Sequence, residues 1–438
     1  MKTTAIATLL TMLAGTAIAA DKAQQAEPEN HAFGQLPKNT GWLSDPDTPA
    51  DTIWDAIGGG KLSLNDRLRF EYADQGSRKP SYAFTNRLRL GYTTKPWEGF
   101  NGMVEMENVA SFDSSLYWVP ATTDGDPARS VVADPQDTEI NQAWLQYHRD
   151  NLFDSDFGLN VKAGRQRLTL DDHRFIGNVG WRQFEQTMDA ARVDLSNGPL
   201  TFTYAHVWRV QRIFSDSNAN NNWDANTHLL HLAWKAADWI TVKPFYYYMN
   251  FDQSAANSNQ TFGVRVDGKV PLGEEDSGLS LAYEGTYAHQ TDEDTNPVNY
   301  DADFFAGDVS VSKKGLGALG VGYQFLGSDN GNMAFRFPLG TNHKFNGWAD
   351  LFLTTPNNGL QDLYGYVKAD LPWGLKGTVV YHQFWFDQNN TDIGHEIDAV
   401  LVKKISPNWV VLTKAAHFDG DAGYIDVTRF WLETTFKF

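Results

Sequence analysis

Segments of about ten residues in which apolar and polar side chains alternate recur from residue 61 to the end of the chain. The segment KLSLNDRLRFEY at 61–72 has leucines and aromatic residues on one face and mostly polar residues on the other. AFTNRLRLGY at 83–92 repeats this pattern, and Asp66 and Asn86 are exceptions on the apolar faces. A period of two residues indicates β-strands whose faces meet different surroundings. Counting gives about 18 segments, so we predict an all-β fold, a transmembrane antiparallel β-barrel of about 18 strands.

The connections between these segments alternate between short and long. The short ones are 95–99, 196–199, 235–239, 313–317, 372–374 and 406–408, and the long ones include 112–137, 168–188, 210–225, 251–259, 289–302 and 327–359. Short periplasmic turns and long extracellular loops are typical of outer-membrane barrels. Four tryptophans at or beside the short turns suit an aromatic girdle on the periplasmic side: Trp97, Trp239, Trp373 and Trp409.

The last segment, DVTRFWLETTFKF, is amphipathic and ends in phenylalanine. Phe430, Leu432, Phe436 and Phe438 share one face, opposite Arg429, Glu433 and Lys437. Such a strand resembles the closing strand of outer-membrane proteins, which the barrel assembly machinery recognises. Closure is required in lipid because an open edge would leave backbone groups unpaired. A soluble β-sandwich or β-helix would explain the alternation, but neither the turn asymmetry nor the terminal phenylalanine.

Composition places this barrel in a Gram-negative outer membrane, in contact with its lipid. Residues 1–19 combine one lysine, a short apolar run and an Ala-Ile-Ala end, which is typical of a secretory signal peptide. Residues 20–60 are polar and form the expected periplasmic lead-in, so the barrel is predicted at 61–438. Cysteine is absent, and the net charge of −18 argues against nucleic acid as a partner.

Arginines cluster on the faces that would line the lumen. The first three segments carry Arg67, Arg69, Arg87 and Arg89 together with Glu71, Glu105 and Glu107, and further cations facing inward or at the rim are Arg165, Arg167, Arg192, Arg265 and Arg429. Rings of charge select ions in pores, and the planar guanidinium group binds carboxylates in a bidentate manner. We therefore predict an anionic oligo- or polysaccharide as the solute. The alternative is that these charges pair with one another and only hold the lumen in shape.

One segment, from Gly164 to Val193, is too polar for a core and too rich in glycine and aromatic residues for an ordinary solvated loop. It reads GRQRLTLDDHRFIGNVGWRQFEQTMDAARV, and chain order places its middle at the extracellular mouth. This block, the block at 335–367 and the shorter TEINQAWLQY (138–147) and GHEID (394–398) resemble the alginate export family of outer-membrane β-barrels. The resemblance spans the chain from about residue 60 to 438.

The resemblance implies a monomeric 18-stranded barrel, an Arg/Lys-rich constriction that conducts anionic polysaccharide, and long loops that gate the pore. It implies lumen or gate positions for Arg165, Asp172, Arg174, Arg182 and Asp189. We predict a channel for anionic sugars or polysaccharide of the alginate type, working by diffusion without catalysis. The family also contains diffusion porins, so a general or small-anion porin is the alternative, and export and uptake both stay open.

Two further patterns suggest other chemistry. Oxygen-bearing side chains recur at every second position in one expected loop: Asp216, Asn218, Asn220, Asn222 and Asp224. Calcium binds such oxygen ligands and is the one cofactor that this pattern suggests. The turn glycine and final glutamate of a calcium loop are absent, so we predict a hydrated loop and no cofactor. His173 beside Asp171 and Asp172 raises the alternative of an outer-membrane hydrolase with its site at the rim. Neither a nucleophile elbow nor a His-Glu metal motif accompanies it, so no catalytic residue is predicted.

Overall fold

The computed structural model describes residues 48–438, except for 121, 123–124, 153–154, 216–220, 275–276 and 294. The predicted signal peptide (1–19), most of the predicted lead-in and three of the five calcium candidates (Asp216, Asn218 and Asn220) lie outside the described residues. Within the described part, no helix is long and apolar enough to cross a membrane.

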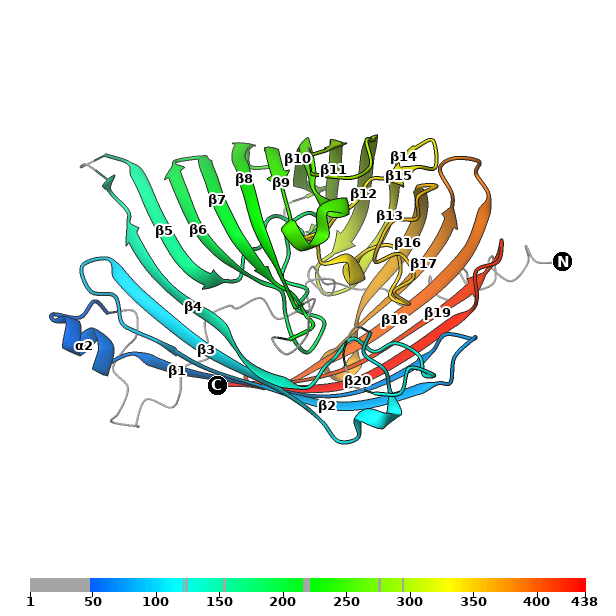
Figure 1. Cartoon of the computed structure of the whole chain (residues 1–438). Helices are drawn as coiled ribbons and strands as arrows, with labels where there is room; N and C mark the ends of the chain where they lie inside the picture. The colour runs from blue at the N-terminus through cyan, green and yellow to red at the C-terminus, as the bar shows by residue number, and fades with distance from the viewer. Residues whose placement is uncertain are drawn as a thin grey trace.

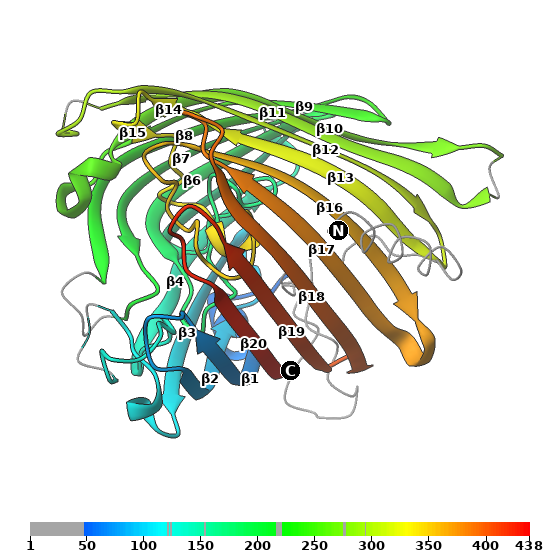
Figure 2. The same ribbon diagram turned by 90° about the vertical axis from the view of Figure 1, so that its right-hand side faces the viewer.

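Eighteen long strands form one closed antiparallel sheet, which confirms the predicted barrel (Figures 1 and 2). They are β1 (Lys61–Asp74), β2 (Ser81–Thr93), β3 (Phe100–Ser111), β4 (Asp137–Arg149), β5 (Phe157–Gln166), β6 (Thr187–Asn197), β7 (Leu200–Gln211), β8 (Asn222–Ala237), β9 (Ile240–Met249), β10 (Asn259–Leu272), β11 (Leu279–Asp292), β12 (Asp301–Lys313), β13 (Gly317–Leu326), β16 (Leu360–Leu371), β17 (Leu375–Trp385), β18 (Asp392–Ser406), β19 (Trp409–Gly420) and β20 (Val427–Lys437). Each strand pairs with its neighbours in chain order, and β20 pairs with β1. Since the sheet closes on itself, no strand edge faces lipid.

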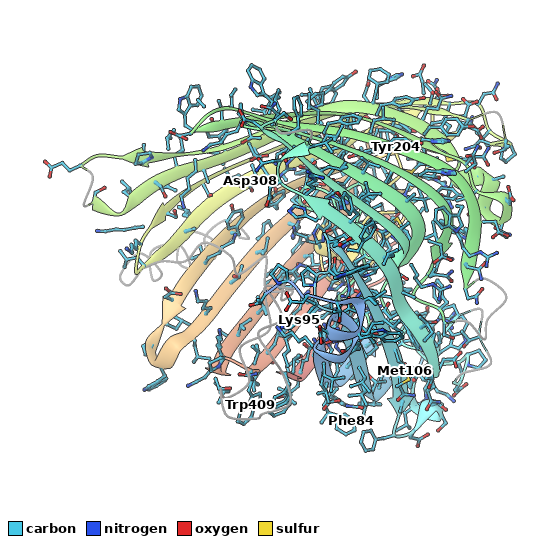
Figure 3. All side chains as sticks on the ribbon, turned by 90° about the vertical axis from the view of Figure 1, so that its left-hand side faces the viewer. Phe84, Lys95, Met106, Tyr204, Asp308 and Trp409 are labelled. Carbon is cyan, nitrogen blue, oxygen red and sulfur yellow. The ribbon has the colours of Figure 1, made fainter. Side chains whose placement is uncertain are left out.

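The alternation in the sequence separates an inner from an outer face. In β1, Arg69 is fully buried whereas Leu62 is 53% exposed. Figure 3 shows Phe84 of β2 projecting from the outer surface of the barrel. The two polar exceptions on this outer face satisfy each other, because Nδ2 of Asn86 donates to Oδ1 of Asp66 at 2.7 Å.

The two ends of the barrel differ. A short helix, α2 (Ile53–Gly58), lies at the end where β1 begins and β20 finishes, and the amide of Leu64 donates to the carbonyl of Phe438 at 3.0 Å (Figure 1). The long connections 112–136, 167–186 and 327–359 all start at the other, external end. The last of them contains the short pair β14 (Ser328–Asp329) and β15 (Met333–Ala334), so β13 pairs with β16 across it.

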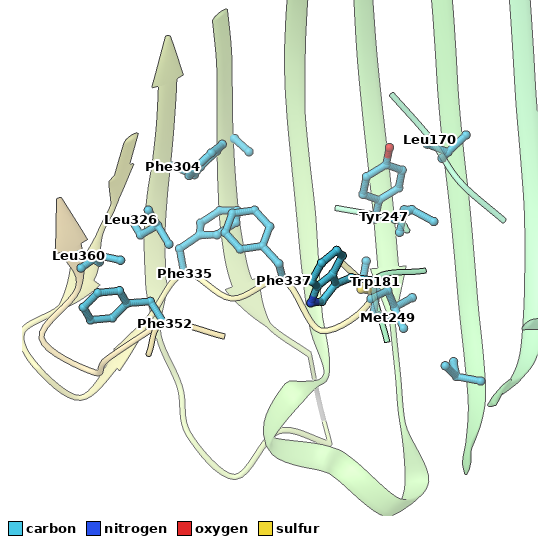
Figure 4. Close-up of a cluster of buried hydrophobic side chains, with 14 of the residues drawn as sticks. Leu170, Trp181, Tyr247, Met249, Phe304, Leu326, Phe335, Phe337, Phe352 and Leu360 are labelled. Carbon is cyan, nitrogen blue, oxygen red and sulfur yellow. The ribbon is translucent and has the colours of Figure 1, made fainter. Parts of the chain in front are cut away.

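The main hydrophobic core lies inside the barrel, between these loops and the inner wall. Figure 4 shows Phe335 and Phe337 of the connection 327–359 beside Phe304 of β12, and Trp181 of the connection 167–186 in the same cluster. The ring centroids of Phe304 and Phe337 are 5.0 Å apart in an edge-to-face arrangement. A lumen packed with aromatic side chains holds its loops by the same burial that stabilises a soluble core.

Candidate functional site

The connection between β5 and β6, residues 167–186, forms a plug loop that crosses the lumen. On one side, Nη1 of Arg67 (β1) donates to the backbone carbonyls of residues 180–182 at 3.0 to 3.2 Å. On the other side, Nη1 of Arg265 (β10) donates to Oδ2 of Asp172 at 2.8 Å. Strands β1 and β10 lie half a circuit apart in the closed 18-stranded sheet. The plug loop therefore extends from one wall of the barrel to the opposite one.

Arg182 is the charged centre of the plug loop. Its guanidinium lies 3.1 Å from Glu71 of β1, 3.9 Å from Asp134 of the connection 112–136 and 2.8 Å from Asp350 of the connection 327–359. All four side chains are buried. Burial alone would raise the pKa of the Asp350 carboxyl, but the interaction with His343, which includes a hydrogen bond, and the charge of Arg182 bring it below its ordinary value. One cation thus ties the plug loop to the wall and to two other loops.

The connection 327–359 forms a second plug loop, which is fastened to β18. The amide of Ala349 donates to Oε1 of Glu396 at 2.7 Å, and the amide of Trp348 donates to Oδ2 of Asp398 at 3.1 Å. Gly347 has a φ of +86°, and a Cβ atom there would lie 2.4 Å from the Glu396 carboxylate. Glycine is therefore required where this loop approaches the wall. The two acids belong to the GHEID motif, so that motif anchors a plug.

A lysine latch joins both plug loops to β19. The ammonium of Lys414 lies 4.0 Å from the ring centroid of Trp181 in the plug loop and 3.9 Å from that of Trp348 in the second plug loop. It also lies 2.8 Å from Nε2 of His343, whose Nδ1 is 2.6 Å from Asp350. Because an ammonium group can only donate, Nε2 accepts and the hydrogen of a neutral imidazole is on Nδ1. Burial, with Lys414 adding and Asp350 opposing, lowers the pKa of His343 to about 3.

Glu185 forms a further charged centre, at the end of the plug loop. It lies 2.5 Å from Arg167 and 3.5 Å from Arg89, and Nδ2 of Asn141 donates to it at 2.5 Å. Arg167 also meets Glu105 at 2.8 Å. Burial would raise the pKa of the Glu185 carboxyl, but Arg167 and Arg89 hold it well below the usual range.

Comparison with sequence models of known families assigns this chain to a family. Residues 67–399, well over half of the chain, match the sequence model of the family described as alginate export. The chain belongs to the alginate export family. A search of curated proteins found no match.

Solved structures similar to this alginate export barrel are outer-membrane porins. OccD3 (OpdP) of Pseudomonas aeruginosa has a TM-score of 0.65 at 14% identity and covers 90% of this chain and 99% of its own. OccAB3 of Acinetobacter baumannii has a TM-score of 0.68 at 14% identity, with coverages of 87% and 100%. OprD of Pseudomonas aeruginosa has a TM-score of 0.63 at 12% identity, with coverages of 91% and 97%. Family and fold together place the chain in the Gram-negative outer membrane as a channel protein.

In this alginate export barrel, most of the predicted site residues lie within the lumen. Strand residues on the inner face are Arg67, Arg69, Arg87, Arg89, Glu105, Glu107, Arg192, Arg265 and Arg429, and plug-loop residues are Arg167, Asp172, Arg174 and Arg182. Arg174 packs its guanidinium 3.9 Å from the ring centroid of Phe337 and donates to Asn346 at 2.7 Å. Its burial lowers its pKa to about 9. Arg192 pairs with Asp194 on its own strand at 2.9 Å.

Arg165, which was predicted to face inward or to lie at the rim, and Asp189, which was predicted in the lumen or gate, do not line the lumen. Arg165 follows the exposed residues Phe157 and Ala163 in the alternation of β5 and therefore lies on the outer face. Its Nε donates to Asp189 at 2.9 Å, and a β-bulge at Asp189 leaves the buried Ala190 on the inner side. These two residues pair with each other at the external rim, because the strand period and not the local charge decides which face a residue occupies.

Several carboxylates and rings of the site were not predicted. The partners of the arginines include Asp134, Glu185, Asp350 and Glu433, and the latch residues are Trp181, His343, Trp348 and Lys414. Glu433 had a usable signal, since it shares the inner face of the last strand with Arg429. The loop residues had none, because their partners are far away in the chain.

The two described calcium candidates, Asn222 and Asp224, lie on β8 and not in a loop. Oδ1 of Asp224 accepts from Arg209 at 2.7 Å and Oδ2 from Gln253 at 3.0 Å. Across the described residues, no group of three or more His, Cys, Asp or Glu side chains is arranged to hold a metal ion.

Proposed function

We propose that this outer-membrane channel passes anionic sugars or uronate-containing polysaccharide by diffusion, without catalysis. The observation that carries the proposal is an arginine wall on three adjacent strands, β20, β1 and β2, formed by Arg67, Arg69, Arg87, Arg89 and Arg429. Arg67 and Arg87 stand directly opposite each other in the strand register. Like charges in register repel, so this pair needs anions close by, and Glu433 lies 3.4 Å from Nε of Arg67.

The environment of Arg87 supports this role. Its Nη2 donates to Asn65 at 2.7 Å, and the nearest carboxylate, Glu107, is 3.9 Å from its Nε. Among the described residues, neither Nε nor Nη1 of Arg87 has a hydrogen-bond acceptor. A buried guanidinium with unused donors favours a carboxylate ligand, because each unpaired donor costs free energy.

Replacing Arg67 and Arg87 together by alanine tests the proposal. The reversal potential of the channel in a planar bilayer, under a gradient of potassium chloride and then of a potassium uronate, should move toward zero. Removing two cations from one wall weakens its field for anions while the closed sheet retains the barrel. Arg209→Ala, on the outer surface, should leave the reversal potential unchanged. Cation selectivity of the unmodified channel would refute the proposal, and selectivity for chloride with exclusion of the uronate would favour a small-anion porin.

A further inference from the structure

A cavity of about 380 Å³ lies in the lumen on the side away from the arginine wall. The inner faces of β9–β12, β13, β16 and β17 line it together with residues of both plug loops. Six carboxylates and four Lys or Arg side chains contribute: Asp171, Asp172, Asp267, Glu284, Asp308 and Asp362, and Lys243, Arg265, Lys344 and Lys368. The carboxylates outnumber the cations, so this lining disfavours an anionic solute.

Two of the four cations of the cavity, Lys243 and Arg265, are already engaged in ion pairs. Lys243 lies 3.2 Å from Asp171 and 2.5 Å from Asp267. Arg265 lies 2.8 Å from Asp172 and 2.5 Å from Glu284. The side chain of Glu284 nevertheless stays 40% exposed, so one of its faces is open to the cavity.

Two tyrosines of β16 lie against the cavity wall. Tyr364 is partly exposed, whereas Tyr366 is 7% exposed and has the ammonium of Lys368 4.7 Å from its ring centroid. A Cβ atom at Gly320 would lie 2.2 Å from the ring of Tyr366, and one at Gly322 would lie 2.2 Å from the ring of Tyr364. The absence of side chains at these two positions of β13 lets both rings rest on the sheet. The two ring planes are nearly parallel, inclined by 18°, and their centroids are 6.3 Å apart. The hydroxyl of Tyr366 donates to Oδ1 of Asp308, which Figure 3 labels on β12, at 2.8 Å.

We propose that this cavity is a binding site for an uncharged pyranose sugar ring. The C–H face of a pyranose packs on aromatic rings because those hydrogens meet the negative face of the π system. The carboxyl oxygens of Asp308 and Glu284 can accept hydrogen bonds from sugar hydroxyls. The volume falls in the range of small-ligand sites. The site goes beyond the proposed function, because the arginine wall serves anions and this cavity serves neutral rings.

Isothermal titration calorimetry on the folded, detergent-solubilised barrel tests the site. The probes are maltose, which is uncharged, and a digalacturonate of the same length, both at low ionic strength. Maltose should bind saturably and more tightly than the digalacturonate. Tyr364→Leu with Tyr366→Leu should weaken maltose binding about tenfold, because the aromatic surface beside the cavity is lost. Tyr364→Phe with Tyr366→Phe keeps the rings and should retain binding, and Tyr323→Leu on the outer face is the matched control.

Three results would overturn the site. They are no saturable binding of maltose by the unmodified barrel, tighter binding of the digalacturonate, and equal binding by the leucine pair and the unmodified barrel. A phenylalanine pair as weak as the leucine pair would also remove ring stacking as the cause. None of these results touches the anion selectivity measured in bilayers, so failure of this site and failure of the proposed function are separate outcomes.

Discussion

Replacing Arg182 by methionine is expected to open the lumen and to raise the single-channel conductance several-fold. Three buried carboxylates, Glu71, Asp134 and Asp350, would lose the cation that lies between them. Removing one partner of a buried ion pair costs about 3–5 kcal/mol, because the remaining charge stays in a poorly solvated place. The plug loop can relieve that cost by leaving the lumen, because water then reaches and solvates the carboxylates. Conductance in planar bilayers is the measurement.

Two controls separate plug release from damage to the barrel. Arg209→Met removes a half-exposed arginine of the outer face that pairs with Asp224, and it should change neither conductance nor folding. Adding Asp350→Asn to Arg182→Met removes one of the stranded charges and should bring the conductance part of the way back. A conductance of Arg182→Met equal to that of the unmodified channel would mean that the aromatic core alone holds the plug loop.

The sequence predicts the barrel well because the alternation of polar and apolar residues within each strand shows which of them face the lumen and which face the lipid. Arg67, Arg69, Arg87 and Arg89 are inward in the structure, as period-two alternation requires, and this needs no knowledge of tertiary contacts. The inward position considered for Arg165 fails for the same physical reason. Its resemblance to a lumen residue rested on charge and motif, whereas its strand parity places it outside.

What the sequence could not predict is how the loops pair. Asp350 meets Arg182 across 168 positions, and Lys414 meets His343 across 71. Neither contact has a local pattern, since loop backbones follow no period and their side chains find partners only after the barrel has closed. The sequence analysis left open the alternative that the lumen charges pair with one another, and much of the observed network fits it. Arg87, with its unused donors, is the member that it describes least well.

Acidification is expected to open the channel through His343. In the closed lumen its pKa is about 3, whereas a histidine released to water has a pKa of about 6.5. The open state therefore binds the proton more tightly, so the plug has its full stability above about pH 6.5 and loses it as the pH falls toward about 3. By pH 5 the loss is about 2 kcal/mol. Conductance recorded from pH 8 to pH 4 should rise below about pH 6.5.

The geometry of the lysine latch explains why protonation of His343 destabilises the closed plug. Protonation at Nε2 would set an N–H donor of His343 against the ammonium of Lys414, 2.8 Å away, with Arg182 adding a second positive charge nearby. Asp350 on the Nδ1 side already accepts its hydrogen bond and offers no relief to Nε2. The carboxyl of Asp350, whose pKa is lowered, weakens the plug only below its ordinary value of about 4.

His343→Gln separates these two steps, because a neutral amide can accept from Lys414 and donate to Asp350 at any pH. Its conductance should stay flat from pH 8 to about 5 and rise only below about pH 4, where the carboxylates protonate. His395→Gln, a half-exposed histidine of β18, should leave the pH response of the channel intact. If His343→Gln keeps the rise below pH 6.5, another group controls the plug, and the neutral His343 of the latch serves only to pack Trp181, with which it stacks at 4.8 Å.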